Sequence, residues 1–338
     1  MTVLCSCDVV FKEHDTGVGH PERPARIDAV AAGLRNHHLG DMLLPFQPRA
    51  ATDDELLRVH PRSHIATIER FAAGGGGHLD VDTVVSERSA ELARLGSGTL
   101  LEALDRLSDG VATGAFVAVR PPGHHATADV AMGFCLYNHV AVAASELRSR
   151  GERVVVVDFD GHHGNGTQDI FWDDPGVMYV SWHQSPHYPN SGRADECGSD
   201  RALGTTLNVP VPAGVTGEHY RRSIEDLVGP AIEEFEPDWM LVSAGFDGHR
   251  ADPLCDLALS SGDIADVVLD LKGLVGKGRV AALMEGGYDL GAVSDCSAAL
   301  VAALGGLRLH PEPPTSGGPG AVFVESAIDR RHRAMDDR

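Results

Sequence analysis

The stretch Arg153–Gly166, RVVVVDFDGHHGNG, decides the fold. Its four consecutive valines predict a strand that is buried on both faces, as strands are in the interior of a parallel sheet. Four side chains of the types that bind metal ions follow the valines directly: Asp158, Asp160, His162 and His163. In open α/β sheets, ligands bind in the crevice beyond the carboxyl ends of the strands. The stretch therefore predicts an interior parallel strand with a site at its end.

Two of these side chains have the spacing of metal ligands. Asp160 and His162 are separated by one residue, so their side chains point the same way in extended backbone. A carboxylate and an imidazole that share a direction form half of a divalent metal site. An acidic turn with surface histidines is the alternative interpretation. So many ligand-type residues directly after a four-valine strand favour the metal site.

Strands and helices alternate along the rest of the chain. The other segments predicted as strands are 3–11, 115–119, 177–182, 206–211, 239–244 and 280–284, and the main predicted helices are 25–35, 64–72, 86–107, 136–150, 218–235, 261–275 and 290–304. This alternation predicts an α/β fold with a doubly wound, mostly parallel sheet, helices on both faces and the active site at the C-terminal ends of the strands. We expect a single domain over 1–338, with a Pro/Gly linker at 311–320 and a final helix at 322–335.

The composition argues against several classes of protein. The net charge of −21 is unlike that of a nucleic-acid-binding surface, which needs basic patches, although an acidic rim could attract a histone tail or a polyamine. No apolar run approaches the ~20 residues that span a bilayer, and the six cysteines form no CxxC pair. We therefore expect a cytoplasmic protein with free thiols that binds neither nucleic acid nor membrane.

Other predicted strands also end in unusual polar groups. These groups are His124 and His125 after 115–119, Ser181 and His183 at 177–182, Asp247 after 239–244, and Tyr288 after 280–284. The carboxyl ends of parallel strands lie on one edge of a sheet, so the groups can converge. Asp160, His162 and Asp247 would then form a three-ligand set with open positions, which is the pattern of a catalytic zinc site.

The motifs that carry these groups resemble those of a known family. RPPGHH at 120–125, GFC at 133–135, DFDGHHGNG at 158–166, SAGFD at 243–247 and EGGY at 285–288 resemble the zinc-dependent histone deacetylase superfamily. That superfamily also contains bacterial acetylpolyamine amidohydrolases and acetoin-utilisation proteins. HPERPARI at 20–27 resembles its N-terminal motif, and the motifs occur in the expected order from His14 to Tyr288. Asn165 and the EGGY form resemble the class II branch.

The resemblance implies two kinds of metal site. One catalytic zinc ion would be bound by Asp160, His162 and Asp247. One structural potassium ion would be bound by Asp158 and Ser181 together with backbone carbonyls of Asp160, His162 and Trp182. A second potassium ion would lie near the carbonyls of Phe171, Asp174 and Val177. The first potassium ion would fix the backbone behind the zinc ligands.

The resemblance also implies the catalytic residues. His125 would be the general base and acid, and His124 its electrostatic partner, oriented by Asp158. Asn165 stands where class I members have an aspartate, and an amide cannot stabilise an imidazolium as a carboxylate would. We therefore expect a lower pKa for His125 than an aspartate would give. Tyr288 would donate a hydrogen bond to the substrate carbonyl and stabilise the oxyanion.

Five further residues are expected to contact the substrate or product. Phe134 and Tyr188 would form the two walls of an acyl-lysine tunnel. Gly133 would offer its carbonyl to the substrate amide. Arg26 matches an arginine on an acetate-exit channel, and Gly287 is expected to bind substrate beside the tyrosine.

These expectations define the function and its alternatives. We expect a zinc-dependent amidohydrolase that removes an acetyl or other short acyl group from an acylated primary amine, such as acetyl-lysine in proteins. An acetylpolyamine deacetylase and a catalytically silent acyl-lysine-binding protein are the alternatives. A two-metal ureohydrolase such as arginase needs more carboxylates beside Asp160 and Asp247, and Asp252 lies five residues beyond the latter. The bacterial relatives suggest a dimer or tetramer.

Several polar residues near these motifs have more than one interpretation. Glu22 is either an acidic rim residue that attracts cationic substrates or part of a turn. His14 and His20 are expected to form loop hydrogen bonds, with lining of the rim as the alternative. His183 and His187 are expected to have structural roles in the loop after 177–182.

Overall fold

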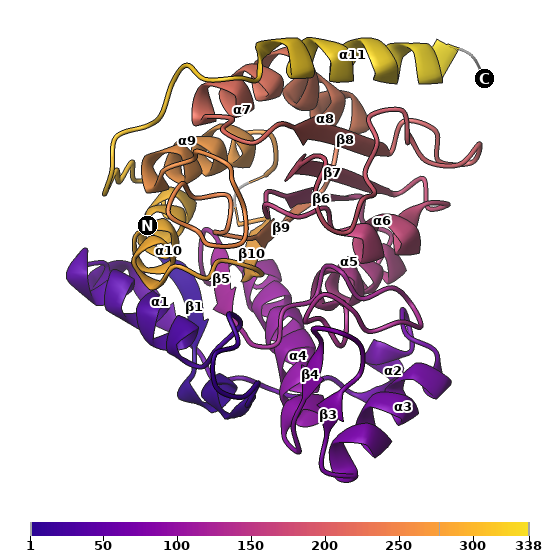
Figure 1. The fold of residues 1–338 in the computed structure, drawn as a ribbon, viewed down its shortest axis with the longest axis vertical. Helices are drawn as coiled ribbons and strands as arrows, with labels where there is room; N and C mark the ends of the chain where they lie inside the picture. Colours follow the sequence, from indigo (N-terminus) through magenta and orange to yellow (C-terminus); the bar gives the residue numbers. More distant parts are fainter. Residues whose placement is uncertain (1, 277, 337–338) are drawn as a thin grey trace.

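An eight-stranded sheet lies at the centre of the protein (Figure 1). The computed structural model describes residues 2–276 and 278–336. The sheet has the order β2-β1-β5-β10-β9-β6-β7-β8, and all of its strand pairs are parallel within the described residues. Its strands are β1 Val3–Cys7, β2 Leu43–Pro45, β5 Ala115–Ala118, β6 Val154–Asp158, β7 Val177–Gln184, β8 Thr206–Val211, β9 Trp239–Ala244 and β10 Val280–Met284. The predicted α/β class and parallel sheet are confirmed.

The four-valine strand β6 lies in the interior of the sheet, between β9 and β7. Its residues are fully buried, as the valine run predicts. The register places Asp158, the last residue of β6, opposite Ser181 in β7 and Ser243 in β9. The first polar residue of each strand therefore lies at the same level of the sheet. This alignment is why the polar groups that follow the strands meet in one place.

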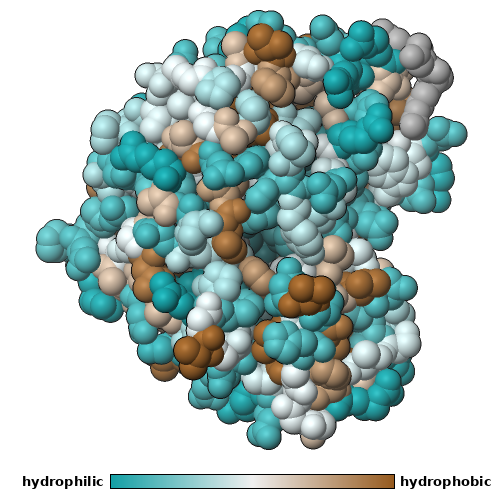
Figure 2. Space-filling view, in the orientation of Figure 1, coloured by the Kyte–Doolittle hydropathy of each residue, from teal (hydrophilic) through white to brown (hydrophobic). Residues whose placement is uncertain are grey.

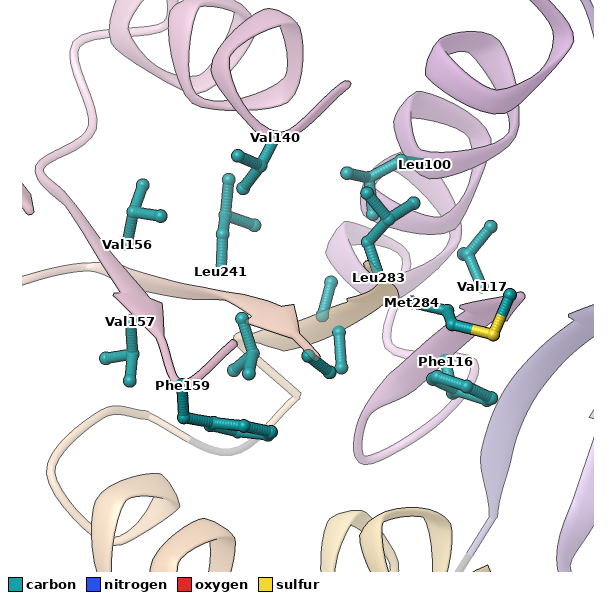
Figure 3. Packing of buried hydrophobic residues seen from close by; sticks show 14 of the residues in the cluster. Leu100, Phe116, Val117, Val140, Val156, Val157, Phe159, Leu241, Leu283 and Met284 are labelled. Carbon is teal, nitrogen blue, oxygen red and sulfur yellow. The ribbon is translucent and has the colours of Figure 1, made fainter. Parts of the chain in front are cut away.

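Helices cover both faces of the sheet (Figure 1). One layer contains α1 Ala25–Asn36, α7 Gly217–Ser223, α9 Ser261–Lys272 and α10 Leu290–Leu304, and the opposite layer contains α4 Ser89–Ser108, α5 His139–Ser149 and α6 Asn165–Phe171. Figure 3 shows that Val156 and Val157, adjacent in β6, point to opposite sides of the sheet. Val156 lies on the side of Val140 in α5, and Val157 lies on the side of Phe159. The sheet therefore packs apolar side chains against helices on both of its faces, and these side chains belong to one buried hydrophobic cluster.

The remaining elements complete the fold. They are the 3₁₀ turns η1 Val9–Glu13 and η2 Gly40–Met42, the helices α2 Asp53–Leu56, α3 Arg62–Ala73 and α8 Gly229–Phe235, the π turn η3 Ile224–Val228, the antiparallel pair β3 Gly77–His78 and β4 Val84–Val85, and the C-terminal helix α11 Ala321–Asp336. Among them, η3 and α8 directly continue helix α7. No helix within residues 2–276 and 278–336 is long and apolar enough to cross a membrane.

Local interactions explain why the first strand and helix α4 differ from their predicted forms. The first strand ends at Cys7 instead of residue 11, because the Asp8 side chain caps the 3₁₀ turn η1 by accepting from the Val10 N–H at 2.9 Å. Helix α4 continues through Gly96 and Gly98. At Gly98 a Cβ would collide with the backbone of residues 49–51, so this glycine permits close packing.

The Pro/Gly segment 311–320, predicted as a linker, lies against the body of the protein and is hydrogen-bonded to it. Thr315 donates to the buried carboxylate of Asp263 through its backbone N–H (3.0 Å) and its hydroxyl (2.6 Å). Helix α11 then packs along β8, the edge strand of the sheet. The Arg331 guanidinium in α11 donates to the backbone carbonyls of Gly204 and Thr206, each at 2.6 Å. The C-terminal segment thus covers a strand edge that would otherwise be free to pair.

Candidate active site

Asp160, His162 and Asp247 converge beyond the carboxyl ends of β6 and β9. The Nδ1 atom of His162 lies 3.1 Å from Asp160 Oδ1 and 2.8 Å from Asp247 Oδ2. One ligand atom from each residue lies within 4.8 Å of the others, and all three residues are buried. The structure therefore brings together the three residues that the sequence predicts as a ligand set.

The chemistry of this cluster fits one divalent cation. Burial, followed by the neighbouring carboxylate of Asp160, raises the pKa of Asp247, so the protein alone does not accommodate both negative charges well. Backbone N–H groups hold the other carboxylate oxygens: Gly161 donates to Asp247 Oδ1 at 2.6 Å and Gly286 to Asp160 Oδ2 at 2.8 Å. Two oriented carboxylates and one imidazole are the donor set of a metal site that keeps open coordination positions.

The tandem histidines have different partners. His124 Nδ1 lies 3.0 Å from the carboxylate of Asp158, which also accepts from the Tyr179 hydroxyl at 3.0 Å. His125 Nδ1 lies 2.8 Å from the amide oxygen of Asn165. In the neutral imidazole of His125, the Nδ1–H therefore donates to Asn165, and the Nε2 lone pair is free.

The different partners separate the two pKa values. Burial lowers the pKa of His124, but the Asp158 carboxylate outweighs burial and raises it to about 10. Burial also lowers the pKa of His125, and the neighbouring His124 and His162 lower it further, so that it lies well below 6.5. At neutral pH, His124 is a cation and His125 is neutral. A pair with separated pKa values is the arrangement expected of an acid–base site.

A buried glutamate fixes the loop that carries the histidines. Glu285 follows β10, and its Oε2 accepts from the backbone N–H of Gly123 (2.7 Å) and of His124 (3.2 Å). Its Oε1 accepts from the Ser243 hydroxyl at 3.0 Å. In the sequence, Glu285 was notable only as part of the EGGY motif. Its position directly after a buried strand was the available signal.

A pocket of about 410 Å³ leads to the cluster. It is lined by His20, Pro21, His78, Val81, Asp82, His125, Gly133, Phe134, His162, His187, Tyr188, Leu254 and Tyr288. Phe134 and Tyr188, the two residues predicted as tunnel walls, both line this pocket: the Phe134 ring lies 5.9 Å from that of Tyr288, and the Tyr188 ring lies 5.2 Å from that of His125. Figure 2 shows a hollow near the centre of this face, with apolar side chains at its rim. The pocket could hold an extended apolar chain and present its end to His125.

Gly133 and Phe134 form a constrained turn in this wall. Both have positive φ, +56° and +68°. A Cβ on Gly133 would collide with the His125 ring, so the position requires glycine. The Phe134 N–H donates to Thr83 Oγ1 at 3.2 Å, which helps to hold a conformation that non-glycine residues rarely adopt.

The structure places Arg26 and Gly287 behind the pocket wall instead of on it. The Arg26 Nε donates to the Gly287 carbonyl at 2.6 Å, and its guanidinium lies 5.2 Å from the centre of the Tyr288 ring. The Arg26 side chain also donates to the carbonyl of Glu285. Arg26 therefore supports the segment that carries Tyr288.

The two residues predicted for the potassium site are adjacent across β6 and β7. Asp158 and Ser181 are paired in register and fully buried. The Ser181 hydroxyl lies 2.9 Å from Nδ1 of His183, and Asp158 Oδ1 accepts from the Asp160 N–H at 3.1 Å. The His183 ring is buried, and its Nε2 lies 2.9 Å from the Gly192 carbonyl.

Glu22 differs from both of its interpretations. It is fully buried, so it is neither a rim residue nor a simple turn residue. Its carboxylate binds Arg120 (Oε2 to Nη2, 2.8 Å) and Arg26 (Oε1 to Nη1, 3.1 Å), and lies 3.4 Å from His14. Burial alone would raise the pKa of Glu22, but the charge of Arg120, followed by His14 and Arg26, lowers it to about 2.

Replacement of Glu22 by glutamine is expected to destabilise the fold by about 3–5 kcal/mol, because two buried guanidinium groups would lose their counter-charge. Since the folded-state pKa lies below the usual 4.5, the stabilisation is fully present above that pH and disappears as the pH falls toward 2. Urea denaturation at pH 7 measures the loss. Glu91→Gln, in an exposed ion pair with Arg88, should cost at most about 1 kcal/mol. Equal costs for the two variants would contradict the prediction.

Several pocket residues were not predicted as such. His187 was expected to be structural, yet it lines the pocket, where its ring stacks on His162 at 4.8 Å and its Nε2 lies 2.9 Å from the Leu254 carbonyl. His20 lines the pocket, which was its less favoured interpretation, whereas His14 is buried beside Ser89. The residues His78, Val81, Asp82 and Leu254 were not predicted individually, because they lie in short or irregular segments without periodic signals.

Asp252 does not join the metal cluster. Its carboxylate accepts from the backbone N–H of Leu254, Tyr288 and Asp289. Among the residues that the structure describes, Asp160, His162 and Asp247 form the only group of three or more acidic, histidine or cysteine side chains arranged to hold a metal. The second metal site of a ureohydrolase is therefore not supported.

Comparisons with known proteins agree on one family. The family model of the histone deacetylase domain matches residues 20–304. The chain is 33% identical over 312 residues to a probable deacetylase of Archaeoglobus fulgidus, which covers 89% of this chain and 87% of that protein. It is 38% identical over 302 residues to the histone deacetylase-like amidohydrolase of Pseudomonas aeruginosa, with 88% and 80% covered.

A plant relative provides the structural comparison. The chain is 36% identical over 319 residues to histone deacetylase 15 of Arabidopsis thaliana; the match covers 92% of this chain and spans 57% of the length of that protein. The crystal structure of the HDA15 HD domain superposes with a TM-score of 0.91 at 33% identity, covering 100% of this chain and 98% of that chain.

Proposed function

Because this chain belongs to the histone deacetylase family, whose domain is a hydrolase acting on amides, we propose that it is a zinc-dependent deacylase of acylated primary amines. Its substrate is acetyl-lysine, or lysine with another short acyl group, in proteins. The observation that carries the proposal is the pocket itself. It leads between Phe134 and Tyr188 to the neutral His125 beside the Asp160–His162–Asp247 cluster.

Asp160, His162 and Asp247 would hold the zinc ion, which when bound polarises the amide carbonyl and lowers the pKa of water. The chain supplies the proton transfers. His125 is neutral with Nδ1–H directed at Asn165, so its Nε2 can accept a proton from the attacking water and return it to the leaving amine. His124 remains a cation beside it and favours the negative charge that develops on the substrate.

Tyr288 is the proposed donor to the substrate carbonyl oxygen. Burial raises the pKa of its hydroxyl well above the usual value, so the hydroxyl keeps its proton at neutral pH. A donor fixed in a water-poor pocket stabilises a developing oxyanion more than water does. The aromatic walls Phe134 and Tyr188 exclude water around the alkyl chain.

We also propose a buried potassium ion at Asp158 and Ser181, with backbone carbonyls completing its ligands. Support comes from the pairing of these two buried oxygen-bearing residues, Asp158 at the end of β6 and Ser181 within β7. The ion would stiffen the backbone that orients Asp160 and His162.

The pocket mouth favours an acyl-lysine peptide but also has a feature that suits a polyamine. Val81 is 98% exposed at the mouth and Leu254 lines it, so an extended peptide would meet apolar side chains there. Asp82 also lines the pocket, and its carboxylate could bind a second amine of an acetylated polyamine. Parallel turnover of acetyl-lysine peptides, acetylated polyamines and longer acyl-lysines separates the two substrates.

Tyr288→Phe is expected to lower kcat by roughly 10²–10³, because one oxyanion donor is lost while the ring remains. Release of fluorophore from an acetyl-lysine aminocoumarin substrate measures it. Tyr188→Phe, which keeps the pocket wall, should change KM by only a few-fold. If the zinc-loaded wild-type protein turns over no acylated amine, the proposed function fails and a silent acyl-lysine-binding protein becomes the better interpretation.

A further inference from the structure

Asp252 is a buried carboxylate that the proposed mechanism does not use. It lies in the loop after β9 and is 8% exposed. Its Oδ1 accepts from the Leu254 N–H at 2.9 Å, and its Oδ2 accepts from the N–H groups of Tyr288 (2.6 Å) and Asp289 (3.2 Å). All three donors are backbone groups. The carboxylate therefore joins the loop after β9 to the loop after β10.

A buried carboxylate in this position calls for an explanation. Burial of a charged group is costly unless hydrogen bonds or an opposite charge compensate for it. Within residues 2–276 and 278–336, no lysine, arginine or histidine side chain forms an ion pair with Asp252. Its hydrogen bonds to three amides compensate in part, and burial, followed by the charge of Asp247, still raises the pKa of Asp252 to about 7. Because both oxygens are engaged, the side chain is poorly placed to bind a second metal.

The same peptide group is held from both of its sides. The peptide that joins Gly287 to Tyr288 has its carbonyl bound by the Arg26 Nε at 2.6 Å and its N–H bound by Asp252 at 2.6 Å. Gly286 and Gly287 precede Tyr288, and Gly287 has a φ of +113°. Such backbone has many accessible conformations unless it is fixed. The two hydrogen bonds therefore determine the plane from which the Tyr288 side chain projects into the pocket.

We propose that Asp252 is a positioning residue for Tyr288. It fixes the Gly287–Tyr288 peptide so that the hydroxyl reaches the substrate carbonyl oxygen, and its third bond places Leu254 at the mouth of the same pocket. The catalytic consequence rests on the proposed function of Tyr288 as oxyanion donor. The structural part, the fixed peptide, can be tested without turnover.

A double-mutant cycle tests the catalytic part. Asp252→Ala is expected to lower kcat by at least ~10-fold, because small displacements of a catalytic group have large effects on rate. In the Tyr288→Phe background, where no hydroxyl needs to be placed, the same change should cost less than about 3-fold. Asp252→Asn keeps one acceptor oxygen and the side-chain shape, so its loss should lie between wild type and alanine. Asp256→Ala, at an exposed aspartate in the same loop, should keep wild-type kcat.

Amide hydrogen exchange tests the structural part. In Asp252→Ala, the amides of Tyr288 and Asp289 should exchange at least ~10-fold faster than in wild type, with Asp252→Asn between the two, while amides in β6 keep their protection. Equal losses of kcat in both backgrounds, or unchanged exchange at 288 and 289, would overturn the proposal. If wild type turns over no substrate but the Asp252 variants show the expected faster exchange, the proposed function is refuted and the positioning of the peptide by Asp252 is still supported.

Discussion

Asp247→Ala is expected to abolish turnover and specific zinc binding together. The variant reduces three converging protein ligands to two, and it removes the carboxylate whose Oδ2 lies 2.8 Å from His162 Nδ1. Catalytic zinc sites use three protein ligands, so a two-ligand site should lose the metal at concentrations that saturate wild type. Turnover should fall below detection, as it should for wild type after chelation. Zinc content after dialysis and the rate on an acetyl-lysine substrate measure the two effects.

The stability of Asp247→Ala separates loss of a ligand from loss of the fold. Zinc at about 1,000 times its Kd should stabilise the wild-type protein by about 4 kcal/mol, seen as a higher melting temperature. The variant should show no such shift. Without zinc it should be close to wild type in stability, because relief of the burial of the Asp247 carboxylate and of its repulsion by Asp160 offsets the loss of its contacts with the Gly161 N–H and His162. A variant that still binds one zinc ion tightly, or that turns over substrate, would contradict the assignment of Asp247 as a zinc ligand.

His125→Ala is expected to lower kcat by roughly 10²–10⁴ with zinc retained, because a positioned proton acceptor is removed and the metal ligands remain. The geometry supports His125 over His124 as the base. His124 is held as a cation by Asp158, whereas His125 has a neutral partner and lines the pocket. Single-turnover rates at saturating substrate, together with zinc content, measure the effect. A loss below 10-fold would point to a different base.

The pH profile provides the matched control for this assignment. Because the pKa of His125 lies well below 6.5, kcat/KM should not fall between pH 8 and 7 through protonation of the base. Asn165→Asp would place a carboxylate on Nδ1 and raise the pKa of His125, so the acid limb of the profile should move to higher pH. An unchanged acid limb in Asn165→Asp would show that His125 does not control it.

Local and periodic signals in the sequence were sufficient for the sheet and the cluster. The four valines of β6 predicted an interior parallel strand, and the spacing of Asp160 and His162 predicted the shared direction of two ligands. The motifs also predicted the family, which the comparisons confirm. The roles of the individual catalytic residues stay predictions until the variants are measured.

Contacts between distant irregular segments could not be predicted in the same way. The carboxylate of Glu22 is bound by Arg120, 98 residues further along the chain, and His20 reaches the carbonyl of Asp82, 62 residues away. No period or spacing connects such pairs. The pocket mouth at Val81 and Leu254 and the buried role of Glu22 therefore became visible only in the folded chain.

The cover of β8 by α11 has a consequence for synthesis of the protein. The helix that protects this strand lies far downstream: 109 residues, 212 to 320, are made between the end of β8 and the start of α11. At ~5–20 residues per second, the ribosome needs on the order of 10 s for that distance. Throughout this interval the carbonyls of Gly204 and Thr206 lack Arg331, and the nascent chain presents an open strand edge. The translating polysome, where neighbouring nascent chains are close together, is thus the place where this fold is most exposed to intermolecular strand pairing.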